Sequence, residues 1–195
     1  MRGLLVVFEG LDQSGKQTQA ERLRDRLVAA GRTVRLLSFP SYETHLGAEI
    51  GRALQGERDY AADTMQLLYV ANRFEWKPEI DRELARGTVV VCDRYLASSV
   101  AYGEAFGLDP AWLFGIQQYL PQPDLTVLLD IDAQVSASRK TADRDKYERD
   151  LALLGRVRES YLRQAAGAGW LRLEAGRDRD AVAEDVFRAV ASLLS

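Results

Sequence analysis

The sequence predicts an α/β fold in which a five-stranded parallel sheet lies between two layers of helices. Short apolar runs alternate with longer segments of helical periodicity along all 195 residues. Most of the runs are apolar throughout, as expected for strands that are buried on both faces of a parallel sheet. Strands that alternate with helices imply right-handed crossovers and a doubly wound sheet. Without linkers or internal repeats, we expect a single domain over residues 1–195.

The five predicted strands are short runs rich in β-branched and aliphatic residues, each followed by a turn or by polar residues. Because parallel strands end at the same edge of the sheet, the loops that follow them should carry the chemistry. The strands are expected at Leu4–Phe8, Thr33–Phe39, Thr88–Cys92, Leu125–Asp130 and Trp170–Leu173.

The helices are marked by apolar residues at helical spacing and by start and stop signals. The first stops at Gly31, the long third one stops at Gly87, and Pro110 stands at a favoured first-turn position. We expect helices at Lys16–Ala30, Leu46–Leu54, Asp63–Arg86, from near Ser98, Asp109–Tyr119, Ala133–Lys140, Asp150–Ala166 and Asp180–Leu194.

A glycine loop between the first strand and the first helix carries the pattern G-x-x-x-x-G-K. Gly10 and Gly15 let successive N–H groups point at one anion, and the helix N-terminus adds partial positive charge. Lys16 supplies a point charge to the terminal phosphates of a nucleotide. The sequence therefore predicts a three-layer P-loop NTPase fold that binds ATP through Gly10, Leu11, Asp12, Gln13, Ser14, Gly15, Lys16, Gln17 and Thr18.

One position departs from the standard loop, because Gln17 replaces the Ser or Thr whose hydroxyl ligates Mg²⁺. Thr18 does not simply take over, since one residue along a helix rotates a side chain by about 100°. One explanation is that the side-chain carbonyl of Gln17 binds the ion weakly. The alternative is that phosphates, water and a carboxylate elsewhere hold it.

An apolar strand ends in Asp93 and Arg94, a carboxylate beside a guanidinium. Asp93 is predicted to hold Mg²⁺ directly or through water, and Arg94 to bind a phosphate through its rigid fork. A structural ion pair at the end of the strand is the alternative. Asp130 ends another strand and competes for the metal, but Asp132 fits a helix N-cap, so we favour Asp93.

Five of the eleven residues from Arg139 to Arg149 are basic. Such a run is usually the solvated face of a helix. In a phosphotransferase it predicts a basic lid over about 139–149 that surrounds the phosphates and excludes water. Tyr69 and Arg73 lie four apart and could stack on a base and read its edge. Their spacing alone favours an ordinary amphipathic helix with Arg73 outside.

Charge and composition exclude several other classes of protein. The net charge of −3 argues against a nucleic-acid coat, and no apolar run is long enough to span a membrane. The N-terminal stretch is too short for a signal peptide, so we expect a cytoplasmic protein. Cys92, the only cysteine, is expected to be a buried packing residue, and His45, the only histidine, a surface helix cap.

Together these motifs resemble the thymidylate kinases over almost the whole chain. The resemblance rests on Phe8-Glu9-Gly10-Leu11-Asp12 with Ser14-Gly15-Lys16, and on the Asp93-Arg94-Tyr95 segment followed by Ala97–Tyr102. Shorter matches add support at Phe39-Pro40, Ala71-Asn72-Arg73, Pro121–Asp124 and Tyr147-Glu148.

The resemblance implies that the γ-phosphate of ATP is transferred to dTMP with Mg²⁺, and that the protein is a homodimer. Asp12 would approach the 3′-hydroxyl and the acceptor phosphate, which Arg94 binds. Phe39 would pack near the sugar, and Tyr102 would crowd a ribose 2′-hydroxyl. Tyr69, Arg73 and Ser99 would meet the thymine, and Arg139 with residues 175–177 would form the adenine side.

Three departures from the family pattern affect the expected mechanism. They are Gln17, Gln13 in place of Gly or Arg, and Ser41-Tyr42 where some relatives have an arginine two residues after the proline. Without a loop arginine, the transition-state cation should come from Arg144 or Lys146 in the lid, with Arg149 and Arg139 as alternatives. A kinase for another nucleotide or nucleoside and a nucleotide-switch ATPase are the competing functions.

Overall fold

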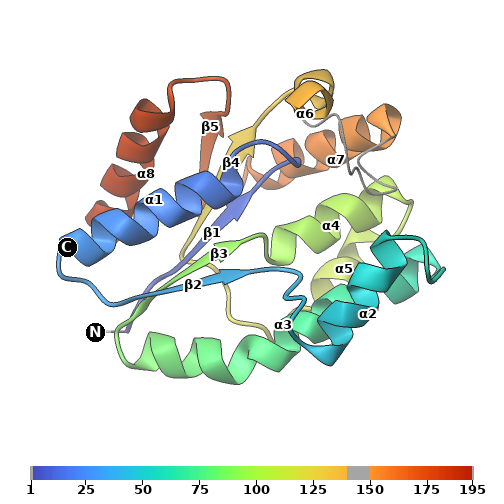
Figure 1. The fold of residues 1–195 in the computed structure, drawn as a ribbon, viewed down its shortest axis with the longest axis horizontal. Coiled ribbons are helices and arrows are strands. Elements are labelled where there is room, and N and C mark those ends of the chain that lie inside the picture. Colours follow the sequence, from blue (N-terminus) through green and yellow to red (C-terminus); the bar gives the residue numbers. More distant parts are fainter. Residues whose placement is uncertain (1, 140–149, 195) are drawn as a thin grey trace.

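The computed structural model describes residues 2–139 and 150–194 and shows one twisted sheet with helices on both faces (Figure 1). All neighbouring strands are parallel, in the order β2-β3-β1-β4-β5. The strands are β1 (Leu5–Glu9), β2 (Val34–Ser38), β3 (Val89–Asp93), β4 (Leu125–Asp130) and β5 (Trp170–Glu174). The expected α/β sandwich is confirmed.

Two layers of helices cover the sheet. Helices α1 (Lys16–Ala29) and α8 (Arg179–Leu194) pack together on one face, and α3 (Ala62–Ala85), α4 (Leu96–Ala105) and α7 (Leu151–Gln164) lie on the other (Figure 1). The remaining helices are α2 (His45–Leu54), α5 (Pro110–Gly115) and α6 (Ala133–Arg139), and α2 packs on α3.

Alternate residues of the central strands feed two different cores, which explains why these strands are apolar throughout. In β1, Val6 and Phe8 pack against α1 and α8, whereas Leu5 and Val7 pack against α3. All four side chains are essentially inaccessible to solvent. Cys92 is buried in the same sheet as a free thiol, as the sequence predicts.

Two local expectations are wrong. The helix that begins at Pro110 ends at Gly115 and not at Tyr119, because the amides of Gln117 and Gln118 bond to carbonyls only three residues back. The cap of α2 is Thr44, whose hydroxyl oxygen accepts a hydrogen bond from the Gly47 N–H at 3.0 Å. His45 is the exposed first residue of that helix.

Within the described ranges, no helix is both long enough and apolar enough to cross a membrane.

Candidate functional site: two pockets that meet at the phosphate loop

The loop between β1 and α1 has the backbone that an anion cradle needs. Gly10 has φ +139°, and a Cβ there would lie 2.5 Å from the carbonyl oxygen of Leu129, so no other residue fits. Gly15 has φ +93° and is the N-cap of α1. The loop therefore leads from the carboxyl end of β1 directly into the N-terminus of α1, the arrangement that suits an anion.

Lys16 is held inside this loop. Its Nζ donates a hydrogen bond to the carbonyl of Leu11 at 2.8 Å, and the side chain is buried. Burial, followed by the nearby Arg94, lowers the pKa of Lys16. A polyphosphate placed here would counter both effects, because it supplies negative charge to an ammonium that has lost its water.

Helix α6 packs against the loop through two hydrogen bonds to its main chain. Ser136 Oγ donates to the carbonyl of Asp12 at 2.6 Å, and Arg139 Nη1 donates to the carbonyl of Gln13 at 3.1 Å. A hollow opens on this side, and Gly176 and Arg177 form its far wall. Five of the residues predicted to bind ATP line it, namely Gln13, Ser14, Gly15, Thr18 and Arg139, whereas Gly10, Leu11, Asp12, Lys16 and Gln17 do not.

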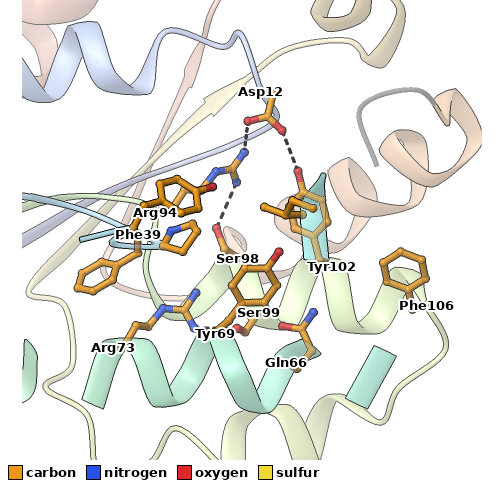
Figure 2. Close-up of a pocket in the computed structure, with 13 residues that line it drawn as sticks. Asp12, Phe39, Gln66, Tyr69, Arg73, Arg94, Ser98, Ser99, Tyr102 and Phe106 are labelled. Carbon is orange, nitrogen blue, oxygen red and sulfur yellow. Dashed lines mark hydrogen bonds and ion pairs between the residues drawn. The ribbon is translucent and has the colours of Figure 1, made fainter. Parts of the chain in front are cut away.

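A second pocket lies on the other side of the loop (Figure 2). Asp12, Arg94 and Tyr102 lie along one side of it, and Tyr69, Arg73 and Gln66 from α3 lie along the other. All seven residues predicted to bind the acceptor line this pocket: Asp12, Phe39, Tyr69, Arg73, Arg94, Ser99 and Tyr102.

Arg94 is the most constrained residue of this pocket. It follows β3 with φ +63°, a left-handed conformation that is uncommon outside glycine and that often marks a functional site. Its Nη2 lies 2.6 Å from Oδ1 of Asp12, and its guanidinium carbon lies 5.5 Å from the centre of the Tyr102 ring. Burial works against the charge, but Asp12 together with Tyr102, Tyr161 and Asp93 outweighs burial, and the pKa of Arg94 is raised.

Asp12 stays ionised beside this cation. Burial raises the pKa of its carboxyl, but the charges of Arg94 and Lys16 outweigh burial and hold it well below the usual range. Its second oxygen accepts a hydrogen bond from the Tyr102 hydroxyl at 3.3 Å. One aspartate thus orders both the arginine and the tyrosine of the pocket.

Arg73 is buried, contrary to what its spacing on the helix favours. Only 3% of the residue is exposed, and Nη1 donates to Ser99 Oγ at 2.7 Å and to Gln117 Oε1 at 3.3 Å. Burial lowers its pKa. Two polar acceptors hold Nη1, whereas Nε is buried without a hydrogen-bond partner among the described residues. The guanidinium lies at the floor of the pocket (Figure 2). A single helix cannot reveal these partners, because both come from other parts of the chain.

The two strand-end carboxylates that compete for a metal have different surroundings. Asp130 accepts hydrogen bonds from Arg158 Nε and Arg172 Nη2, both at 2.7 Å, so its oxygens are engaged. Asp93 has a buried Oδ1 with no hydrogen-bond partner among the described residues. Burial raises the pKa of Asp93, against the opposing effects of Lys16 and Arg94.

The described residues contain no cluster of three or more metal-ligating side chains. Mg²⁺ commonly binds one or two carboxylates together with substrate phosphates and waters, so a single free carboxylate fits such an ion. Gln17 does not contribute in this arrangement. It is exposed, and its Nε2 donates to Glu21 Oε1 at 3.0 Å along the surface of α1.

Three polar residues of this region were not predicted to be site residues. Glu9 and Tyr161 are buried behind Arg94, and Gln66 lines the pocket with only 2% of its surface exposed and its Oε1 without a partner among the described residues. Glu9 had a usable signal, since a carboxylate inside an apolar strand must have partners. Gln66 and Tyr161 sit on helices with no motif. The predicted lid residues Arg144, Lys146 and Arg149 lie outside the described residues.

Comparison with known proteins agrees with this geometry. Residues 8–186 match the sequence model of the family described as thymidylate kinase. The human thymidylate kinase is 34% identical over 194 residues, covering 95% of this chain and 88% of the relative, and that of Plasmodium falciparum is 33% identical over 193 residues, covering 98% and 91%.

The solved structure of thymidylate kinase from Candida albicans is also similar. It superimposes with a TM-score of 0.87 at 27% identity, covering 98% of this chain and 92% of that one. Since the family model spans most of the sequence and relatives above 30% identity match nearly all of it, this chain belongs to the thymidylate kinase family.

Proposed function

We propose that this protein transfers the γ-phosphoryl group of ATP to dTMP and releases dTDP and ADP. The observation that carries the proposal is the position of two consecutive residues. Asp12 lines the pocket of Arg73 and Arg94, and Gln13 lines the hollow beside Arg139. A donor nucleotide in the hollow and an acceptor in the pocket would therefore bring their phosphates together at this loop.

On the donor side, the residues present fit a polyphosphate. The main-chain amides of the loop and the N-terminus of α1 would surround the polyphosphate. Ser14 has a buried hydroxyl oxygen without a partner among the described residues. Lys16 places an ammonium beside them, which would balance the charge of the terminal phosphates. The carboxylate of Asp93 would hold Mg²⁺. When bound, the ion would neutralise negative charge that develops on the phosphates during transfer.

On the acceptor side, charge and shape divide the pocket in two. Arg94 and Asp12 form the polar end, suited to the phosphate and the neighbouring 3′-hydroxyl. Tyr69 and Phe39 provide aromatic surface for the base and the sugar, and Arg73 with Ser99 provides polar groups for the base edge. Tyr102 stands beside Asp12, where its ring would crowd a ribose 2′-hydroxyl.

The chemistry needs no covalent intermediate and no histidine. The acceptor phosphate oxygen is already a nucleophile near neutral pH, so in-line positioning and charge stabilisation supply the rate. A transition-state cation from Arg144 or Lys146 stays a prediction, with Arg149 and Arg139 as alternatives. A lid over 139–149 within a single domain of residues 1–195 stays a prediction as well.

A substrate panel tests the proposal directly. ADP release at fixed ATP and Mg²⁺ is measured with dTMP, dUMP, dCMP, dGMP, AMP and thymidine, and without any acceptor. We expect release to depend on dTMP. A preference for another member of the panel would assign a different nucleotide or nucleoside kinase. Release that is equally fast without an acceptor would favour a nucleotide-switch ATPase.

The homodimer and the cytoplasmic location also stay predictions. Most of the apolar residues of α3 pack within this chain, and Leu67 is the one large hydrophobic residue of the helix that is strongly exposed, at 48%. Light scattering on the purified protein tests the dimer. We expect a mass of two chains, and a shift toward one chain on substitution of Leu67→Glu.

A further inference from the structure

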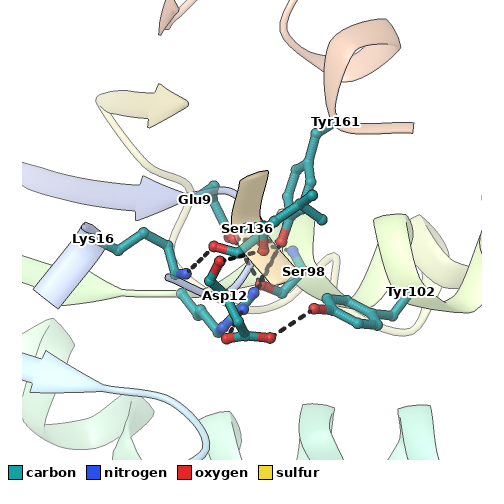
Figure 3. A network of polar contacts seen from close by, with 9 residues as sticks. Glu9, Asp12, Lys16, Ser98, Tyr102, Ser136 and Tyr161 are labelled. Atoms are coloured by element: carbon teal, nitrogen blue, oxygen red, sulfur yellow. Dashed lines mark hydrogen bonds and ion pairs between the residues drawn. The ribbon is translucent and has the colours of Figure 1, made fainter. Parts of the chain in front are cut away.

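Behind Arg94, on the side away from the pocket, lies a buried carboxylate with four hydrogen-bond donors. Glu9 is fully buried at the end of β1. One of its oxygens accepts from the main-chain amides of Tyr95 at 2.8 Å and Ser98 at 3.2 Å. The other accepts from the hydroxyls of Ser98 at 2.6 Å and Tyr161 at 3.0 Å, which converge on it in Figure 3.

The two hydroxyls connect this carboxylate to the guanidinium of Arg94. Nη1 of Arg94 lies 3.3 Å from Ser98 Oγ and 3.2 Å from the Tyr161 hydroxyl oxygen. Each hydroxyl has a single proton, and a carboxylate without a proton can only accept. The two hydroxyl oxygens also lie 2.9 Å apart, and either could donate to the other. Whether a proton is directed at Glu9 or at the other hydroxyl, each oxygen keeps a lone pair for Arg94.

The protonation of Tyr161 is consistent with this role. Only 1% of the residue is exposed, and burial raises the pKa of its hydroxyl, so the group stays a neutral phenol that can donate to Glu9. Tyr161 lies on α7, Glu9 is the last residue of β1, and Arg94 directly follows β3. At Nη1, Arg94 therefore meets the hydroxyls of Ser98 on α4 and Tyr161 on α7.

The two terminal nitrogens of Arg94 have separate partners. Nη1 bonds to the buried hydroxyls, and Nη2 bonds to Asp12, whose side chain is 32% exposed at the pocket. An anion in the pocket can reach the Asp12 side of the guanidinium without disturbing the buried side. Nη1 is therefore held by buried hydroxyls, whereas Nη2 can exchange Asp12 for an anion in the pocket.

We propose that Tyr161 is a positioning residue for the acceptor phosphate, because its hydroxyl fixes Arg94 in the orientation that this phosphate needs. The inference rests on the proposed function, in which Arg94 binds that phosphate. Tyr161 does not touch the substrate. It acts with Ser98 and Glu9 from behind the guanidinium.

The test compares Tyr161→Phe with a matched control, Tyr95→Phe. Tyr95 is also a buried tyrosine, but its hydroxyl has no hydrogen-bond partner among the described residues. Steady-state kinetics gives KM for dTMP and for ATP, and calorimetry gives the affinity for thymidine, which lacks the phosphate. In Tyr161→Phe we expect KM for dTMP to rise about tenfold, the factor that one hydrogen bond to a charged group contributes.

KM for ATP and the affinity for thymidine should change by less than about twofold in that variant, since neither depends on a hydrogen bond to Arg94. The control Tyr95→Phe should resemble the wild type in KM for dTMP, in KM for ATP and in the affinity for thymidine. An unchanged KM for dTMP, or an equal loss of thymidine and dTMP affinity, would overturn the inference. The latter result would mean general damage to the pocket.

If Tyr161→Phe does not fold, Ser98→Ala removes the second hydroxyl that faces Nη1 and decides by the same criteria. A wild-type protein that does not phosphorylate dTMP would refute the proposed function, and the role of Tyr161 would then need a separate test. In that case, calorimetry with inorganic phosphate still compares the anion affinity of wild type and variant. We expect weaker binding by Tyr161→Phe, and equal affinities would overturn the inference.

Discussion

Arg94 and Asp12, 82 residues apart in sequence, form an ion pair with Nη2 2.6 Å from Oδ1 at the boundary between the two pockets. The pair orders the loop and the arginine at the same time. An acceptor phosphate bound to Arg94 would compete with this carboxylate for the same nitrogen. The site is therefore organised before the substrate arrives, and part of that organisation must change when it binds.

The ion pair predicts a pH dependence of stability that disappears in Asp12→Asn. The folded state holds the pKa of Asp12 below its usual 3.8, because Arg94 and Lys16 outweigh burial. The contribution of the ionised Asp12 to the free energy of unfolding is therefore fully present above pH 3.8. It is lost as the pH falls through the folded-state pKa. At pH 7 we expect Asp12→Asn to lower the free energy of unfolding by about 1–2 kcal/mol, allowing for solvent screening.

Urea unfolding of both proteins from pH 7 to pH 3 measures this difference. The difference should be constant down to about pH 4 and then shrink, since the Asp12 carboxylate of the unfolded wild-type chain begins to take up a proton there. A difference that does not depend on pH, or that grows in acid, would contradict the assignment of Asp12 as the ionised partner.

Arg94→Lys tests whether the shape of the guanidinium matters as well as its charge. Arginine bonds to Asp12, Ser98 and Tyr161 from two nitrogens, and a lysine ammonium cannot reproduce this planar fork. We expect kcat/KM for dTMP to fall about 10- to 100-fold, equivalent to one or two charged hydrogen bonds. KM for ATP serves as the internal control and should stay near the wild-type value. A lysine variant with normal dTMP kinetics would show that charge alone suffices.

The sequence predicts the fold, the phosphate loop and the Asp93-Arg94 segment because the signals for these features are local. Gly10 and Gly15 sit where the backbone has φ values that favour glycine, so the loop could be recognised from spacing. Apolar runs predicted the strands, since both faces of the sheet are covered. Asp93 and Arg94 could be placed at the carboxyl edge because they directly follow such a run.

Local signals could not predict the interior of the acceptor pocket, and its lining residues followed only from the family resemblance. Arg73 looked like an exposed residue on a helix, and its burial depends on Ser99 and Gln117, which are 26 and 44 residues away. Tyr161 lies 152 residues from Glu9, and no motif links them. Long-range hydrogen bonds between single polar side chains leave no periodic pattern in a sequence.

Gln17→Thr tests how magnesium is held. Gln17 is directed along the surface of α1 toward Glu21, so its replacement loses about 0.2–0.5 kcal/mol of helix stability and no contact in the site. A hydroxyl at this position ligates Mg²⁺ in other phosphate-loop proteins, so half-maximal activity should need about threefold less Mg²⁺. Gln17→Ala, which adds no ligand, should keep the wild-type dependence. An inactive threonine variant, or an unchanged magnesium titration, would contradict this account.

Tyr102 should set the preference for a deoxyribose over a ribose acceptor through its ring and not its hydroxyl. The ring lies beside Arg94, and the hydroxyl donates a long hydrogen bond of 3.3 Å to Asp12. Tyr102→Phe keeps the ring, so the ratio of kcat/KM for dTMP to that for ribothymidine monophosphate should change little. Tyr102→Ala opens space for one hydroxyl, and the ratio should fall about tenfold, because small steric differences are worth about that factor.

The comparison between the two variants separates steric exclusion from hydrogen bonding. If the phenylalanine variant loses discrimination as strongly as the alanine variant, the Asp12 hydrogen bond and not the ring excludes ribose. If neither variant changes the ratio, the 2′-position of the acceptor does not face Tyr102, and the sugar must lie elsewhere in the pocket. Both substrates carry the same base and phosphate, so damage to Arg73 or Arg94 would lower both rates without changing the ratio.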